Sequence, residues 1–144
     1  MLVSLVDFGS PSFDELVHLR DLILRKPLGM SFKPDELSSE YNSIHFAAYT
    51  NDLELLGTLV MKPLDNHQIK MRQVAVFPFA QRKGVGQLMV AASETYAKEN
   101  NFKEIVLSAR VPAVPFYEKL GYFVTSGLYQ EVGIDHYKMV KKLK

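Results

Sequence analysis

The stretch Gln81-Arg82-Lys83-Gly84-Val85-Gly86 lies between an apolar run, residues 73–78, and a segment with helical periodicity that continues from residue 87. The first N–H groups of a helix lack intrahelical partners, and the aligned peptide dipoles place roughly half a positive charge there. Glycines let an anion approach the backbone closely, and the two basic side chains add positive charge. The stretch therefore predicts a strand-to-helix corner that can bind an anion such as a diphosphate.

Two common phosphate-binding motifs are missing from this corner. The pattern GxxxxGK[ST] does not occur, and the pattern GxGxxG is incomplete because only Gly84-Val85-Gly86 is present. For an isolated pair of glycines, a tight polar turn that binds nothing is the simpler interpretation, because short motifs often occur by chance. The corner alone leaves both interpretations open, so other parts of the sequence must decide between them.

The composition is that of one globular domain. The chain has 144 residues, and we expect a single domain over residues 1–144. Because 17 Lys and Arg face 16 Asp and Glu, there is no electrostatic basis for a nucleic-acid or membrane partner. No cysteine is present, which excludes disulfides and thiolate nucleophiles. The start of the chain has no signal-peptide pattern and no apolar run reaches about 20 residues, which predicts a cytoplasmic protein.

We expect no metal. Without cysteine a metal site would need histidines and carboxylates, and the four histidines show neither HxxxH nor HExxH spacing. His18 and His67 are expected to lie on the surface.

The order of the expected elements predicts an α+β fold with a mixed, mostly antiparallel sheet flanked by helices. Strands are expected at residues 1–6, 44–50, 55–61, 69–77, 104–109, 122–129 and 137–143. Helices are expected from the capping box Ser12-Phe13-Asp14-Glu15 to before Pro27, and over residues 34–41, 84–99 and 113–120. The strand before the longest helix and the strand after it form a βαβ unit, so they should be parallel.

The corner at residues 81–86 resembles the Gln/Arg-x-x-Gly-x-Gly/Ala signature of the GNAT (Gcn5-related N-acetyltransferase) superfamily. A second stretch at residues 113–122, Ala-Val-Pro-Phe-Tyr-Glu-Lys-Leu-Gly-Tyr, is similar to that superfamily's A-xx-F-Y-E-K-L-G-F segment. Two motifs in order are much more specific than one. The resemblance covers residues 69 to about 123 and is to small, uncharacterised bacterial members.

This resemblance implies a sheet whose central parallel strands splay apart, with acyl-CoA in the gap. The pyrophosphate would lie on the corner N–H groups, and the pantetheine would pair with the preceding strand. The implied cofactor-binding residues are Val74, Ala75, Val76, Gln81, Arg82, Lys83, Gly84, Val85 and Gly86. Where many members carry an Asn, this chain has Arg110, which leaves the role of that amide open.

Acetyl transfer to an amine needs a proton donor for the departing thiolate. Tyr117 is the candidate, because a phenol of pKa ~10 can protonate or orient a thiolate of pKa ~8.5. The resemblance favours this role over simple packing, whereas Phe116 is expected in the core. A strand N–H near Val76 or Phe77 is the candidate donor to the oxyanion.

The amine also needs a base, because an alkyl amine of pKa ~10.4 is almost fully protonated at neutral pH. Glu131 and His136 flank residues 132–135 just before the expected last strand, and histidine suits proton uptake. Residues 131–136 resemble the E-x-G-I-x-H segment of some bacterial members. A simple hairpin turn is the alternative, and His45 and Glu54 are weaker candidates for the base.

The leading hypothesis is transfer of the acetyl group of acetyl-CoA to a primary amine of a small molecule or peptide. The alternative is an acyl-CoA-binding regulatory module without catalysis. The expected partners are acetyl-CoA and an amine acceptor, with no nucleic acid and no membrane, and a homodimer is compatible with the sequence. The acceptor pocket would come from residues 20–60 and 125–137, whose pattern identifies no ligand.

Overall fold

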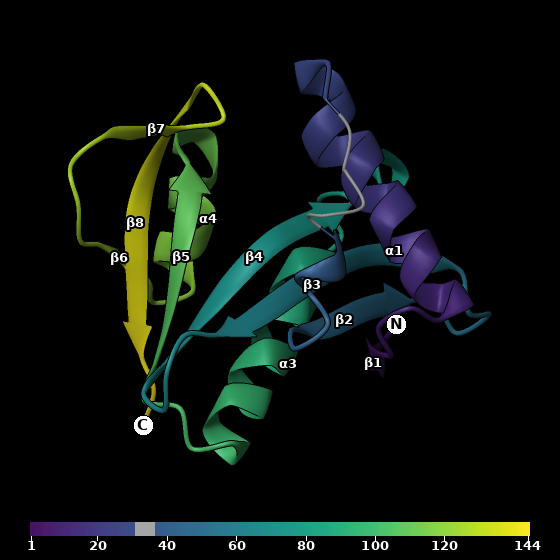
Figure 1. The fold of residues 1–144 in the computed structure, drawn as a ribbon, viewed down its shortest axis with the longest axis horizontal. Helices are drawn as coiled ribbons and strands as arrows, with labels where there is room; N and C mark the ends of the chain where they lie inside the picture. Colours follow the sequence, from purple (N-terminus) through teal and green to yellow (C-terminus); the bar gives the residue numbers. More distant parts are fainter. Residues whose placement is uncertain (31–36) are drawn as a thin grey trace. The chain divides into compact units, whose positions relative to one another are not determined.

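A mixed sheet flanked by helices forms the fold, as expected (Figure 1). The computed structural model describes residues 1–30 and 37–144, and within these ranges the sheet order is β1-β2-β3-β4-β5-β8-β6, with β7 paired to β8. The strands are β1 Leu2–Val6, β2 Ile44–Tyr49, β3 Leu55–Pro63, β4 Gln68–Val76, β5 Glu104–Arg110, β6 Phe123–Val124, β7 Tyr129–Glu131 and β8 Ile134–Lys142. The α-helices are α1 Pro11–Arg20, α3 Val85–Glu99 and α4 Val114–Lys119.

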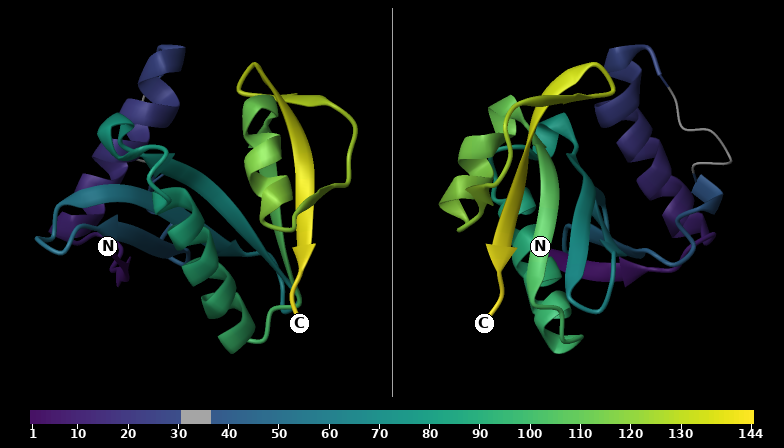
Figure 2. Two further views of the ribbon diagram at one scale, coloured as in Figure 1. Left: turned by 180° about the vertical axis from the view of Figure 1, so that it is seen from behind. Right: turned by 60° about the vertical axis from the view of Figure 1, so that its left-hand side comes forward.

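The chain forms two compact units. The first comprises Met1–Lys62 and Gln73–Ser93, and the second comprises Pro63–Arg72 and Glu94–Lys144. Strand β4 and helix α3 each contribute residues to both units, and the elements can be followed in further views in Figure 2. Within residues 1–30 and 37–144, no helix is long and apolar enough to cross a membrane.

In the first unit, α1 begins two residues earlier than the capping box predicts. Ser10 Oγ accepts a hydrogen bond from the Phe13 N–H at 3.1 Å, which makes Ser10 the N-cap. Pro11 occupies the first helical position, where its missing N–H costs nothing. The expected start at residue 12 is therefore wrong. After Arg20 the helix continues as a π-helical turn, Asp21–Arg25.

A buried ion pair joins α1 to the chain before β2. Arg20, whose side chain is fully buried, donates to both carboxylate oxygens of Glu40 at 2.9 and 2.7 Å. On β2, His45 Nε2 lies 3.3 Å from the Glu40 carbonyl oxygen. The helix expected over residues 34–41 lies partly outside the described residues, because residues 31–36 are not described.

A glycine in β3 lets the first half of α3 pack closely on the sheet. An alanine Cβ at Gly57 would lie 2.9 Å from Met89 Cε, 3.0 Å from the Ala75 carbonyl oxygen and 3.2 Å from Val85 Cγ1. These distances leave no room for a side chain. The close packing fixes the start of α3 against β3 and the end of β4.

In the second unit, β5 lies between a parallel and an antiparallel neighbour. Its pairing with β4 runs from Gln68↔Glu104 to Met71↔Leu107, which confirms the parallel βαβ unit. Along β5, buried residues alternate with half-buried ones.

The end of the chain differs from the prediction. The expected strand at residues 122–129 is replaced by two short strands, β6 and β7, and β8 begins at Ile134 rather than at residue 137. Val132 and Gly133 have φ values of 48° and 74°, and two consecutive positive φ angles are typical of a two-residue type I′ hairpin. Because the turn needs only these two residues, the last strand begins directly after it, at Ile134.

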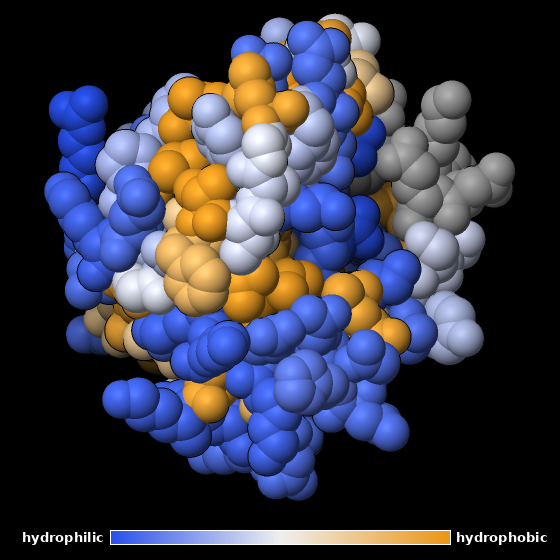
Figure 3. Space-filling model, turned by 90° about the vertical axis from the view of Figure 1, so that its left-hand side faces the viewer, coloured by the Kyte–Doolittle hydropathy of each residue, from blue (hydrophilic) through white to orange (hydrophobic). Residues whose placement is uncertain are grey.

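Apolar side chains are not confined to the core. Figure 3 shows one face of the molecule on which hydrophobic residues lie exposed among hydrophilic ones. The exposed large apolar residues of the second unit include Phe116, Phe123, Val124, Leu128 and Val132. Phe116 is therefore not a core residue, and that expectation is wrong. The reason is that α4 spans only six residues and buries a different face, on which Tyr117 lies.

Candidate active site

The predicted anion-binding corner begins where β4 ends, in the first unit. A 3₁₀ turn, Pro78–Ala80, follows the strand, and Gln81 Nε2 donates to the Val76 carbonyl oxygen at 3.1 Å. Arg82 and Gly84 both have left-handed backbones, with φ values of 63° and 84°. Left-handed residues that alternate with ordinary ones can direct successive N–H groups towards one point, which is a recurrent way of binding anions.

Helix α3 opens directly from this turn. Val85 is buried, whereas residues 81–84 are exposed, and the Leu88 N–H donates to the Gly84 carbonyl oxygen at 3.0 Å. Nothing lies within 4 Å of the position that a Cβ on Gly84 would take. The first N–H groups of this 15-residue helix therefore lie next to two exposed basic side chains, Arg82 and Lys83, and to an open space. This arrangement is suited to binding an anion.

Two N–H groups near the end of the strand that precedes the corner are alternatives for the oxyanion donor, and one of them is already hydrogen-bonded. The Phe77 N–H donates to the Leu56 carbonyl oxygen at 2.9 Å, so it is occupied and the prediction of Phe77 as oxyanion donor is wrong. Of the two residues expected, Val76 remains the candidate. Ala75 is buried, while Val74 and Val76 are half-buried.

Gln73 also has a left-handed backbone, with φ of 54°, two residues after the last pair of β4 with β5. A non-glycine residue with positive φ is uncommon. Nothing in the amino-acid type signals this irregularity, so the sequence could not reveal it.

In the second unit, α4 carries the candidate proton donor. Tyr117 is 7% exposed, and its ring packs edge-on against Phe116 and Tyr122, with centroids 5.0 and 5.8 Å apart. Burial raises the pKa of Tyr117 to about 12. The hydroxyl therefore keeps its proton throughout the physiological pH range.

The two candidate bases lie close together in the second unit. His136 Nδ1 is 2.7 Å from the Ile134 carbonyl oxygen, so Nδ1 carries the hydrogen and Nε2 has the lone pair. Nε2 lies 3.7 Å from Glu131 Oε2. The imidazole is buried and the carboxylate is half exposed, with 5% and 48% of each side chain accessible. His136 lies within β8, not before it as predicted.

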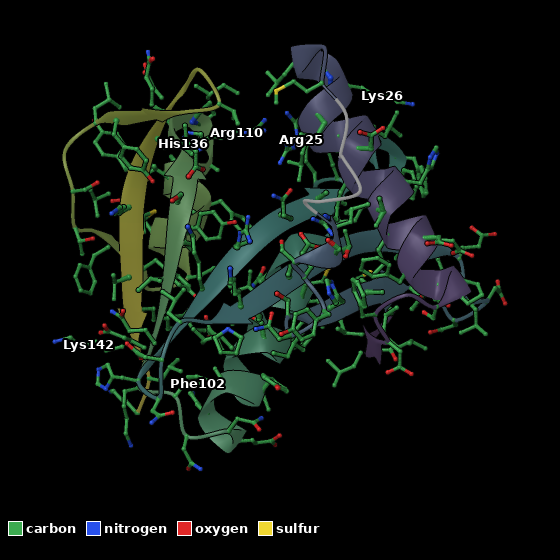
Figure 4. All side chains as sticks on the ribbon, in the orientation of Figure 1. Arg25, Lys26, Phe102, Arg110, His136 and Lys142 are labelled. Carbon is green, nitrogen blue, oxygen red and sulfur yellow. The ribbon has the colours of Figure 1, made fainter. Side chains whose placement is uncertain are left out.

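Arg110, at the position where many family members have Asn, ends β5 and is the register partner of His136. Figure 4 labels both side chains, which lie at the same end of β5 and β8. Tyr129 on β7 also faces this group, with its ring centroid 6.0 Å from that of His136. A basic side chain therefore lies at the position where many members of the superfamily that the sequence resembles carry a neutral amide.

The weaker candidates differ in their surroundings. His45 is buried in the first unit, its ring centroid 4.9 Å from that of Phe13, and burial lowers its pKa. Glu54 is exposed. His18 and His67 are exposed, as expected. Among the described residues there is no cluster of three or more His, Cys, Asp or Glu that could hold a metal ion.

Sequence reasoning missed one polar cluster of the second unit. Glu94 on α3 contacts both Tyr122 and Lys141, which are 28 and 47 residues away in the chain. No motif connects positions so far apart, and only the fold reveals their contact.

These observations define an α+β fold with a mixed sheet and a candidate anion-binding corner, and comparison with known proteins identifies the family. Residues 26–143 match the model of the acetyltransferase (GNAT) domain. The chain is also 32% identical, over 108 residues covering 74% of each chain, to the uncharacterized N-acetyltransferase YjcF of Bacillus subtilis (strain 168). The chain belongs to the GNAT acetyltransferase family.

Two further proteins are similar to this chain, one over only about half of its length and the other at low sequence identity. The uncharacterized protein YyaT of Bacillus subtilis (strain 168) is 30% identical over 77 residues, 54% of this chain and 52% of YyaT, so the chain spans about half of that relative. A GNAT family acetyltransferase from Elizabethkingia anophelis, solved with acetyl-CoA bound, has a TM-score of 0.76 and 18% identity, covering 99% of this chain and 97% of that one. At this identity the second likeness concerns the fold alone.

Proposed function

We propose that this protein transfers the acetyl group of acetyl-CoA to a primary amine of a small molecule or peptide. The observation that carries the proposal is the corner at residues 81–84, where Arg82 and Gly84 adopt left-handed backbones directly before the start of α3. Exposed N–H groups, the helix dipole and two basic side chains suit the diphosphate of coenzyme A.

We further propose that residues 1–144 act as one catalytic domain. The family model spans residues 26–143 and therefore includes residues of both compact units. The corner, with Val74, Ala75 and Val76 as the proposed strand for pantetheine, belongs to the first unit. The proposed catalytic residues Tyr117, Glu131 and His136 belong to the second unit.

In the proposed reaction the amine nitrogen attacks the thioester carbonyl carbon, the carbon–sulfur bond breaks, and coenzyme A leaves as a thiolate. With a pKa of about 12, Tyr117 holds its proton more tightly than a thiol of pKa ~8.5 does. It therefore serves as a hydrogen-bond donor that stabilises the thiolate, and solvent completes the proton transfer. The N–H of Val76 is the proposed donor to the oxyanion.

The proton from the amine goes to His136 Nε2, the ring nitrogen with the free lone pair. The imidazolium that forms then faces the Glu131 carboxylate at 3.7 Å. Opposite charges at this distance attract one another. Glu131 thus supports His136, and its greater exposure provides a route by which the proton reaches solvent.

A screen for thiol release from acetyl-CoA tests the proposal, over amines, polyamines, amino acids, aminoglycosides and peptides. The expected result is amine-dependent release of one thiol for each acetylated product, detected by mass spectrometry. If acetyl-CoA binds but no amine is acetylated, the protein is the regulatory acyl-CoA-binding module instead. Location in the cytoplasm and a homodimeric state remain predictions.

A further inference from the structure

A carboxylate on α3 is held through both of its oxygens. Glu94 Oε2 accepts a hydrogen bond from the Tyr122 hydroxyl at 3.0 Å, and Oε1 accepts one from Lys141 Nζ, also at 3.0 Å. The side chain of Glu94 is 14% exposed, so this carboxylate is mostly removed from solvent. Hydrogen bonds to a charged, shielded group are stronger than neutral ones, and this group of three is therefore well fixed.

The same ammonium group also holds the end of α4. Lys141 Nζ donates to the Leu120 carbonyl oxygen at 2.7 Å, one residue after the helix ends. A cation at this position satisfies a free carbonyl and interacts favourably with the helix dipole. Gly121, with φ of 95°, brings the backbone so close that a Cβ would lie 3.3 Å from Lys141 Cε.

Tyr122, which is held by Glu94 and Lys141, contacts Tyr117 through both its ring and its backbone. The two rings pack edge-on with centroids 5.8 Å apart, and the Tyr122 N–H donates to the Tyr117 carbonyl oxygen at 3.1 Å. Lys141 Nζ lies 5.7 Å from the centroid of the Tyr122 ring. Tyr122 is thus held at its hydroxyl, its ring and its backbone, and its ring packs directly against that of Tyr117.

We propose that Glu94, Tyr122 and Lys141 form a positioning network that fixes the hydroxyl of Tyr117 for its hydrogen bond to the thiolate of coenzyme A. The inference rests on the proposed function, because it assigns a role to Tyr117 in acetyl transfer. Tyr122 is a positioning residue in this network and does not touch the reacting atoms.

Tyr122 remains a hydrogen-bond donor under all assay conditions. Burial, followed by the negative charge of Glu94, raises its pKa well above the ordinary value. The contact with Glu94 therefore persists over the pH range of the reaction, and the network is a constant support rather than a pH switch.

The test begins with Tyr122→Phe, which keeps the ring and removes only the hydroxyl. Small displacements of a reacting group lower turnover strongly, and we expect kcat to fall about tenfold while KM for acetyl-CoA changes by less than about twofold. Glu94→Gln is the second variant, because it removes the charge that binds Lys141. Glu99→Gln, an exposed carboxylate on the same helix, is the matched control and should keep the parental kcat. Melting temperatures confirm that each variant is folded.

A double-mutant cycle separates a positioning role from general structural damage. If Tyr122 acts through Tyr117, Tyr122→Phe should have almost no further effect on kcat in a Tyr117→Phe background. An equal loss in both backgrounds overturns the proposal, and so does an unchanged kcat in Tyr122→Phe alone.

The cycle also distinguishes this inference from the proposed function. If the single variant Tyr117→Phe lowers kcat and the single variant Tyr122→Phe does not, only the positioning network is overturned. If Tyr117→Phe itself keeps the parental kcat, the role of Tyr117 is wrong and the network falls with it.

Discussion

At the scale of single residues, the surroundings of Tyr117 decide how its hydroxyl can act. With a pKa of about 12, the phenol stays protonated, so it can donate a hydrogen bond but does not ionise in the assay range. We expect Tyr117→Phe to lower kcat roughly 10²-fold, because the ring is kept and only the donor is lost.

The pH dependence of this loss is itself a prediction. The donor is the protonated form, which is retained at every pH below its pKa of about 12. The ratio of parental to variant kcat should therefore stay constant from about pH 7 to about pH 10. Measurement of kcat at saturating substrates tests this, and a ratio that approaches one by about pH 10 would contradict it.

The base can be identified by comparing His136→Gln with Glu131→Gln. Because His136 Nδ1 is committed to the Ile134 carbonyl oxygen, Nε2 is the atom that takes the proton. We expect His136→Gln to flatten the acid limb of the kcat/KM profile and to lower the rate. Glu131→Gln should keep the limb and lower the rate less, because the carboxylate only stabilises the imidazolium.

The ionisation of the amine enters the same profile, so the comparison is repeated with an acceptor of lower pKa. A limb that moves with the acceptor belongs to the substrate. If both variants keep the parental profile and rate, the hairpin from Glu131 to His136 is only a turn, and another proton route operates.

At the scale of elements, β2 carries a buried histidine that packs against α1, and its burial makes stability depend on pH. Burial lowers the pKa of His45 from its ordinary value of 6.5. The unfolded chain then binds more protons than the folded one between the lowered pKa and 6.5, so stability is complete above this window and is lost as pH falls through it.

His45→Phe is the informative change, because it preserves an aromatic ring against Phe13 and Phe8. We expect its free energy of unfolding, measured by urea titration, to fall less steeply than that of the parent as pH drops below about 6.5. His18→Phe serves as the control, because His18 is exposed. If the free energy of unfolding falls equally steeply with pH in the parent and in His45→Phe, His45 is not the cause of the pH dependence.

Elements with a long periodic pattern were predicted well, and those defined by local geometry were not. The apolar positions of α3 recur over four turns, and its bounds agree with the prediction to one residue. The start of α1 was predicted wrongly because Ser10 and Ser12 can both act as an N-cap. Ser10 is the N-cap in the structure, because the proline that follows it is favoured at the first position of a helix. The final hairpin depends on the positive φ of Val132, an unusual conformation for a β-branched residue.

At the scale of the whole molecule, a candidate site can be proposed from contiguous motifs in the sequence, whereas contacts between distant residues cannot. The corner and the segment around Tyr117 each lie within about ten residues, so a motif can carry them. The contact of Glu94 with Tyr122 and Lys141, and the occupied N–H of Phe77, depend on strands and helices that meet only after folding. Reasoning from a single sequence therefore identifies the motifs but not the long-range contacts around them.

Binding of acetyl-CoA should raise the free energy of unfolding of the protein, so a change at the corner can be detected by measuring overall stability. A ligand at about one hundred times its Kd adds about 2.7 kcal/mol to the free energy of unfolding. Gly84→Ala places a methyl group in the open space at the corner and strains a backbone with φ of 84°. We expect weaker binding, and a tenfold rise in Kd would reduce the added stability to about 1.4 kcal/mol at the same concentration.

Gly9→Ala is the matched control for Gly84→Ala, because Gly9 has φ of 77° and equally open surroundings but lies before α1. Both substitutions carry a similar backbone cost of roughly 1 kcal/mol without ligand. Only Gly84→Ala should also show a smaller stabilisation by acetyl-CoA, which thermal unfolding with and without ligand measures directly. Equal responses in the two variants would place the diphosphate elsewhere, because the shared strain would then be the sole effect of either change.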